Sequence, residues 1–194
     1  MAFINFNKRL IKRALNYLLI AFLIFIIVSP NGKAWVLRQF ISVGLFKAEI
    51  KKDAVKDLPG NSSFSFTDSK GNTNNTSRLE GKVVFINFWA SWCPPCRAEM
   101  FSINELYQKL QSDTNFVFLS INEDDDKSKA DAYLENNHFS FPIFYTSGNV
   151  PGEIFAGTLP TTIVLNKQGK IVLKHEGLAG YNSDSFISQL KGLQ

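Results

Sequence analysis

The 194-residue chain is poor in the residues that hold metals and build disulfide frameworks, because it contains only two cysteines and two histidines. A disulfide-stapled secreted domain would spread more cysteines along a shorter chain. The histidines, His138 and His175, stand in no finger-like spacing with the cysteines, so we expect no metal site. Covalent haem is excluded as well, since Arg97 stands where a C-x-x-C-H motif needs its histidine.

The chain also lacks a basic excess in the part that should fold. Its formal net charge is +4, but five of its 21 lysines and arginines lie within the first 33 residues. The remaining 16 basic residues face 17 acidic ones, so the rest of the chain is nearly neutral. A nucleic-acid-binding domain needs a basic face, and we therefore expect no nucleic-acid partner.

Charge is absent from one long stretch near the N-terminus. Residues 14–32 carry no charged side chain, and four basic residues precede them: Lys8, Arg9, Lys12 and Arg13. At about 1.5 Å per residue, a helix over this stretch approaches the ~30 Å thickness of a bilayer core. Because positive flanks stay in the cytoplasm, we expect residues 1–13 to be a cytoplasmic basic terminus and residues 14–32 to be a single-pass transmembrane anchor.

Two alternatives to the anchor share its pattern, namely a cleaved signal peptide and a buried core helix. The exit segment, residues 29–34, lacks a convincing small-x-small cleavage site, which favours a retained anchor. Residues 33–60 would then form a juxtamembrane segment and tether. Within it, the apolar stretch 35–45 suits either an interfacial anchor, with Trp35 at its start, or packing on the domain, whereas the charged residues 47–59 are expected to be the tether proper.

From residue 61 to residue 194 the pattern is that of a folded α/β domain. Apolar runs and alternation predict a hairpin around residues 64–71, strands at 83–89, 116–121, 141–145, 161–165 and 171–175, and helices after residue 93, near 127–136 and over 186–193. This order predicts a mixed central sheet flanked by helices. The acidic run Glu123–Asp126 lacks the ligand spacing of a calcium loop and is expected to be a solvated connection.

The two cysteines lie three positions apart, where a buried strand gives way to a helix. The segment reads Trp89-Ala90-Ser91-Trp92-Cys93-Pro94-Pro95-Cys96-Arg97. Cys93 should sit at the helix N-terminus, where unpaired N–H groups and the helix dipole stabilise a thiolate, and the first turn tolerates both prolines. We expect Cys93 to attack a partner disulfide and Cys96 to resolve the mixed disulfide, with no cofactor beyond the redox-active Cys93–Cys96 pair.

This segment resembles the active-site motif of the thioredoxin superfamily, and its Pro-Pro dipeptide is similar to the TlpA/ResA-like branch. The resemblance covers about residues 60–194 and implies a thioredoxin fold with an N-terminal hairpin and a central insert. It implies a thiol–disulfide oxidoreductase anchored in the bacterial inner membrane, with its catalytic domain on the periplasmic or extracytoplasmic side. The implied partners are protein disulfide substrates, apocytochrome c among them, and a membrane electron donor, so we expect the enzyme to act as a reductant.

The resemblance also assigns roles to residues outside the cysteine pair. Pro160 matches the family's cis-proline beside the active site, and Leu159 should offer backbone hydrogen bonds to a bound peptide. Glu99, three residues after Cys96, matches an acid that tunes the cysteine pair, although a first-turn glutamate that complements the helix dipole is the alternative. Asn87 departs from the family, because it stands where ordinary thioredoxins carry a buried aspartate.

Three residues of the motif are expected to shape the substrate-binding surface: Trp92, Pro94 and Pro95. For Trp92 a plain packing role is the alternative. Two other functional classes stay open for the domain, a thiol peroxidase and a tethered binding or chaperone module. The paired cysteines argue against the peroxidase. Normal function of a variant that lacks both Cys93 and Cys96 would favour the binding module.

Overall fold

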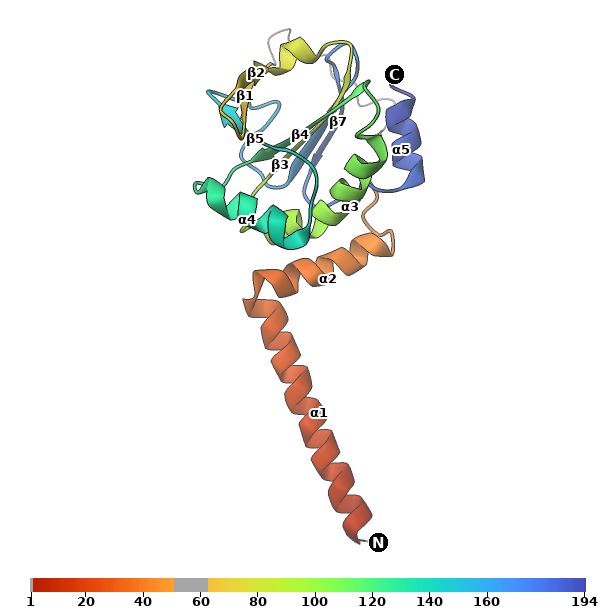
Figure 1. Cartoon of the computed structure of the whole chain (residues 1–194). Coiled ribbons are helices and arrows are strands. Elements are labelled where there is room, and N and C mark those ends of the chain that lie inside the picture. Colours follow the sequence, from red (N-terminus) through yellow and green to blue (C-terminus); the bar gives the residue numbers. More distant parts are fainter. Residues whose placement is uncertain (1, 51–62) are drawn as a thin grey trace.

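A mixed seven-stranded sheet forms the centre of the computed structural model, which describes residues 2–50 and 63–194 (Figure 1). The strands are β1 (Ser65–Asp68), β2 (Thr73–Asn75), β3 (Val83–Trp89), β4 (Phe116–Asn122), β5 (Ile143–Ser147), β6 (Thr161–Leu165) and β7 (Ile171–Glu176). Their order in the sheet is β2-β1-β5-β4-β3-β6-β7. The central strand β3 pairs parallel with β4 and antiparallel with β6, which confirms the mixed sheet.

Both faces of β3 are buried, as its unbroken apolar run predicts. Val83, Phe85 and Trp89 belong to one hydrophobic core, which holds the buried side chains of three helices: α3 (Pro94–Leu110), α4 (Lys127–Asn137) and α5 (Asp184–Lys191). Val84, Ile86 and Phe88 belong to a second core on the opposite face of the sheet. The alternation along one strand therefore sets the two layers of the domain.

The expected N-terminal hairpin and central insert are both present. β1 and β2 pair antiparallel, and Phe64 and Phe66 contribute to the second core. A short 3₁₀-helix, Thr76–Leu79, then leads toward β3. The insert is α4 and β5, and β5 joins the hairpin to β4 in the sheet. β5 begins at Ile143, two residues later than expected, because Pro142 has no N–H to donate to a ladder.

The N-terminal segment forms two helices where one anchor helix over residues 14–32 was expected. α1 (Ala2–Val28) ends before Ser29, and α2 (Pro30–Ser42) begins with proline at its first position. The side chain of Ser29 accepts the N–H of Gly32 at 3.3 Å and caps α2. Proline cannot supply the N–H that would continue α1, so the chain bends by 93° here. In the described part of the chain no single helix has the length and apolar character of a membrane span. Taken together, the bent pair α1 and α2 has the length and the composition of one.

The juxtamembrane stretch packs on the domain along one face of α2. Ala34 and Ile41 form a small core with Ala98 of α3, which supports the packing alternative for residues 35–45. The start of the expected tether also lies on the domain, because Ala48 is buried and donates its N–H to the carbonyl oxygen of Gly180 at 3.0 Å. The rest of that tether, residues 51–59, lies outside the described residues, as does the expected domain start at residue 61.

Candidate active site

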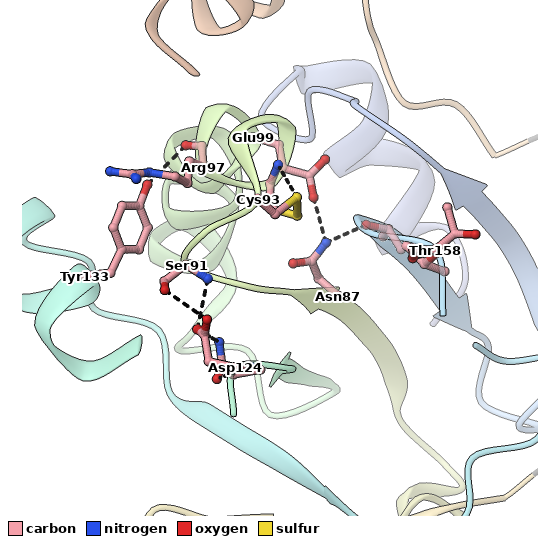
Figure 2. The surroundings of a disulfide bond; sticks show 12 residues. Asn87, Ser91, Cys93, Arg97, Glu99, Asp124, Tyr133 and Thr158 are labelled. Atoms are coloured by element: carbon pink, nitrogen blue, oxygen red, sulfur yellow. Dashed lines mark hydrogen bonds between the residues drawn. A yellow bond between two sulfur atoms is a disulfide. The ribbon is translucent and has the colours of Figure 1, made fainter. Parts of the chain in front are cut away.

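Cys93 and Cys96 form a disulfide at the N-terminal end of α3 (Figure 2). Cys93 caps the helix, and Pro94 and Pro95 fill its first positions, as expected from their tolerance there. The N–H of Cys96 donates to the sulfur of Cys93 at 3.3 Å. The N–H of Arg97, the next along the helix, donates to the Cys93 carbonyl oxygen at 3.0 Å. One backbone donor and the helix dipole therefore act on the Cys93 sulfur.

Exposure separates the residues of the motif. Cys96 is fully buried and Cys93 is 3% exposed, so in the disulfide form both cysteines are largely shielded from solvent. Trp92 is 62% exposed and projects from the surface directly before Cys93. Its exposure speaks against a plain packing role. Pro94 and Pro95 are half-buried beside it.

The peptide bond between Leu159 and Pro160 is cis, as the resemblance implied. β6 begins one residue later, and its Thr161 is the register partner of Phe88 near the end of β3. The cis bond therefore lies at the end of β3 where the chain leaves the sheet and enters the cysteine turn. Pro160 is buried and Leu159 is partly buried. A peptide-binding role for both residues stays a prediction.

Glu99 is fully buried, and Figure 2 shows its carboxyl group beside the disulfide. Its Oε1 accepts a hydrogen bond from Nδ2 of Asn87 at 2.8 Å, and its Oε2 accepts the N–H of Ala179 at 3.3 Å. Burial raises the pKa of Glu99 from 4.5 to about 8, and these hydrogen bonds only partly oppose that rise. Glu99 lies in the second turn of α3, whose first turn has no acidic residue, so the structure does not support the helix-dipole alternative.

Asn87 connects Glu99 to β6. Its Nδ2 also lies 2.9 Å from Oγ1 of Thr162, while its Oδ1 is buried without a partner among the residues that the structure describes. Tyr181 is fully buried in the same region, and burial, with a smaller contribution from Glu99, raises its phenol pKa well above 10. Nothing in the sequence indicated that Thr162 and Tyr181 lie at this site. Sheet pairing with Asn87 brings Thr162 here, and packing among apolar residues brings Tyr181.

Asp124 holds the turn that leads into the cysteines, a role that the sequence interpretation missed. Its two carboxylate oxygens accept the N–H and the hydroxyl of Ser91, each at 2.9 Å (Figure 2). Asn122 donates from Nδ2 to the same carboxylate at 2.8 Å. The expectation of a solvated loop is therefore wrong for Asp124, which is 8% exposed, and right for Asp125 and Asp126. The available signal was an acid directly after a buried strand, where parallel strands end together.

Neither histidine takes part in this site. His138 ends α4 in the left-handed conformation, with φ of 56°, and His175 lies 3.3 Å from the carbonyl oxygen of Leu178 through Nε2. Over residues 2–50 and 63–194, no cluster of His, Cys, Asp and Glu side chains is arranged to hold a metal ion. The chemistry of the site is therefore that of a disulfide at a helix N-terminus with a buried acid behind it, which can accept and release two electrons.

Comparisons with known proteins agree with this chemistry. Residues 53–182 match the Redoxin family profile. Thiol-disulfide oxidoreductase ResA of a Bacillus cereus strain is 32% identical over 145 residues, which cover 71% of this chain and 82% of that protein. The protein of the same name in Bacillus anthracis is 31% identical over 158 residues, covering 81% and 86% of the two chains.

Solved structures show the same fold. A putative thiol:disulfide interchange protein DsbE from Chlorobium tepidum has a TM-score of 0.59 at 24% identity and covers 74% of this chain and 99% of its own. A thiol-disulfide oxidoreductase from Bacteroides fragilis has a TM-score of 0.56 at 26% identity, covering 72% of this chain and 100% of its own. Both structures match about three quarters of this chain.

Proposed function

Because the chain belongs to the Redoxin family and is a thioredoxin-like thiol–disulfide oxidoreductase related to ResA, we propose that it reduces disulfides in extracytoplasmic proteins from a membrane-anchored position. The single observation that carries the chemistry is the Cys93 sulfur at the start of α3, with the N–H of Cys96 aimed at it from 3.3 Å. This donor stabilises the Cys93 thiolate, which is both the attacking group and a good leaving group.

The reaction begins from the reduced pair. The Cys93 thiolate attacks one sulfur of a substrate disulfide, the substrate S–S bond breaks, and the released substrate thiolate takes up a proton. The Cys96 thiolate then attacks the Cys93 sulfur and releases the second substrate thiol. Two electrons have passed to the substrate, and the Cys93–Cys96 disulfide seen in the structure is the product. A donor dithiol restores the reduced pair by the same exchange.

In this proposal Glu99 accepts and returns the proton of Cys96. With a pKa of about 8 it changes charge near neutral pH, unlike an exposed glutamate, and it lies behind the disulfide in the interior. In its ionised form it can accept the thiol proton of Cys96 before the resolving attack. Asn87 cannot exchange a proton, but it orients the carboxyl group through its 2.8 Å hydrogen bond.

Two groups of residues beside the cysteines would receive the substrate. The exposed Trp92 and the half-buried Pro94 and Pro95 border Cys93, and Leu159 with the cis-bonded Pro160 lies at the neighbouring end of β6. A substrate peptide that forms hydrogen bonds with the backbone at Leu159, just before β6 begins, would bring its disulfide against Cys93. Apocytochrome c is one substrate of suitable chemistry, because its two haem-binding cysteines can form a disulfide that must be reduced.

The proposed location follows from the N-terminal segment. Residues 1–13 would stay in the cytoplasm, α1 would enter the bacterial inner membrane, and the domain would lie on the periplasmic or extracytoplasmic side. The basic residues before the uncharged stretch support this orientation, and the uncharged apolar run within α1 supports its entry into the bilayer. In an oxidising compartment a reductase needs electrons from outside, so we expect a membrane-bound dithiol donor.

Trapping tests the function directly. Cys96→Ser cannot resolve the mixed disulfide, so its Cys93 should retain extracytoplasmic substrates as adducts that dithiothreitol releases, and mass spectrometry would identify them. Cys93→Ser is the matched control and should trap far fewer proteins, because the backbone donor at the start of α3 stabilises the thiolate of Cys93. Equal capture by the two variants would show that Cys93 is not the attacking residue. The names of the curated relatives favour this exchange over a thiol peroxidase.

A further inference from the structure

Helix α2 is apolar on its inner face, which contacts the domain. Ala34 and Ile41 pack with Ala98 of α3, and Leu37 joins this core from the same side. The guanidinium of Arg38 lies 3.4 Å from the centre of the Phe101 ring on α3. These contacts fix α2 to the helix that carries the cysteine pair.

Large apolar side chains are also exposed on the outer side of α2 and in the turn after it, beside the polar side chains of Lys33 and Gln39. We define this outer face by five exposed residues: Trp35 (53%), Phe40 (43%), Val43 (71%), Leu45 (66%) and Phe46 (41%). At 100° per residue, Trp35 and Phe40 lie about 100–120° to either side of the line through Ala34 and Ile41, and Val43 follows directly after the helix. A large exposed apolar patch marks an interaction site. The domain covers only one side of α2.

The outer face continues the apolar surface of α1 around a right-angled bend. Trp35 packs edge-on against Phe22 of α1, with ring centroids 6.4 Å apart. The bend is closely packed, since a Cβ at Gly32 would lie 2.7 Å from the carbonyl oxygen of Phe25. Figure 1 shows α1 leading away from the domain and α2 lying between them. With 93° between the helices, an α1 that crosses a bilayer places α2 along the bilayer surface.

Charge points to the same occupant. The segment from Pro30 to Ala48 contains three cations, Lys33, Arg38 and Lys47, and the first acidic residue of the whole chain is Glu49. Cations at a membrane surface are attracted to anionic headgroups by about 1 kcal/mol each, and tryptophan prefers the interface.

We propose that α2 lies in the surface of an anionic lipid bilayer, with its outer face at the boundary of headgroups and acyl chains. The proposal rests on the membrane anchorage included in the proposed function. Arg97, the residue after Cys96, donates a hydrogen bond to Asn31 near the start of α2, so the disulfide end of α3 is held close to the bend. The bilayer therefore fixes the height and orientation of the disulfide, and partner thiols must be presented near the membrane surface.

Depth-dependent quenching of tryptophan fluorescence tests the docking. Full-length protein with Trp92→Phe would be reconstituted in vesicles of phosphatidylcholine and phosphatidylglycerol whose acyl chains carry bromine either near the headgroup or near the chain end. The probes are the native Trp35 and, in a Trp35→Phe background, Val43→Trp at the far end of α2 or Ile20→Trp within α1. Trp89 is buried in the domain and is subtracted with a variant that lacks any probe.

We expect bromine near the headgroup to quench tryptophan fluorescence at positions 35 and 43, and we expect aqueous acrylamide to quench both only weakly. At position 20, bromine near the chain end should quench more strongly. An interfacial helix sits about 5–10 Å into this boundary, which explains the shallow preference. Replacement of phosphatidylglycerol by phosphatidylcholine should weaken the effect at position 43.

Three results would overturn the docking. Free access of acrylamide to position 43, with position 20 still quenched by lipid, leaves the anchor standing and removes the surface contact. Shielding of position 43 from both quenchers, increasing with protein density in the vesicle, assigns the outer face to a second copy of the chain. Absence of lipid quenching at position 20 removes the anchor and the docking together, whereas the attack of Cys93 on substrate disulfides, measured separately by Cys96→Ser trapping, would still be observed.

Discussion

Asn87 and Glu99 form a buried pair in which Nδ2 of the amide lies 2.8 Å from Oε1 of the acid, and neither residue is more than 1% exposed. The two residues come from β3 and α3, the elements on either side of the cysteine turn. The pair therefore links the strand that delivers the cysteines to the helix that holds them, and it keeps an ionisable group out of water at that junction.

The burial of Glu99 predicts a pH-dependent stability. The carboxyl group titrates near 4.5 when unfolded and near 8 when folded, so between these values the folded chain keeps a proton that the unfolded chain has lost. Raising the pH through this window therefore lowers the free energy of unfolding, by up to a few kcal/mol. Glu99→Gln should flatten this decline, measured by urea unfolding of the reduced and the oxidised protein at several pH values. Glu135→Gln, at an exposed site on α4, should keep the wild-type slope. Parallel curves for the wild type and Glu99→Gln would contradict the prediction.

The hydrogen bonds of Asp124 predict that this residue stabilises the cysteine turn. Asp124→Ala leaves the N–H and hydroxyl of Ser91 without their acceptors and should cost about 1–3 kcal/mol. Disulfide-exchange rates should fall as well, because the turn before Cys93 loses its support. Asp125→Ala, at the exposed neighbouring position, is the control and should change neither quantity. Urea unfolding and insulin reduction would measure the two effects, and an unchanged Asp124→Ala protein would refute the role.

The two cysteines should differ in reactivity once they are reduced. Cys93 receives the N–H of Cys96 at its sulfur, and Cys96 is fully buried. Near neutral pH we expect iodoacetamide to label Cys93 about tenfold faster than a free peptide thiol, since the thiolate fraction sets the rate. Peptide mapping of briefly alkylated protein would give both rates. Labelling of Cys96 ahead of Cys93 would reverse the assigned roles.

Trp92 should contribute to substrate binding with little effect on folding. Its side chain is exposed, so Trp92→Ala should change the free energy of unfolding by no more than about 0.5 kcal/mol. Loss of an aromatic contact should lower kcat/KM for protein disulfides on the order of tenfold. A small disulfide such as oxidised glutathione makes fewer contacts and serves as the control reaction. Equal losses on both substrates would assign Trp92 to the chemistry of the pair instead.

The domain could be predicted from the sequence where local pattern and burial agree. The strand Val83–Trp89 was predicted to its last residue because an unbroken apolar run has no alternative on a two-sided sheet. Cys93 was placed at a helix start because a buried strand ends before it and a helical pattern follows, and the first turn tolerates the two prolines. The cis bond at Pro160 came from the resemblance alone, since nothing in local composition distinguishes it from the other prolines.

Features that depend on contacts distant in sequence were missed or left open. The hydrogen bonds from Ser91 to Asp124 exist because β3 and β4 end side by side, which a linear pattern does not show. The break at Ser29 was missed because the uncharged run continues past it, although serine before proline is a helix-start signal. The burial of Glu99 depends on Asn87 and Ala179, which lie far from it in the chain.

The packing of α2 on α3 affects where a soluble fragment should be cut. A recombinant fragment that starts at residue 61 would omit Ala34, Ile41 and Ala48. Water would then reach Ala98 and Leu178, which pack in the same small core as Ala34 and Ile41. Such a fragment should self-associate more strongly at high concentration and be less well suited to crystallisation. A piece that starts at Ser29 keeps the lining of α3 in place and omits only the long helix before it.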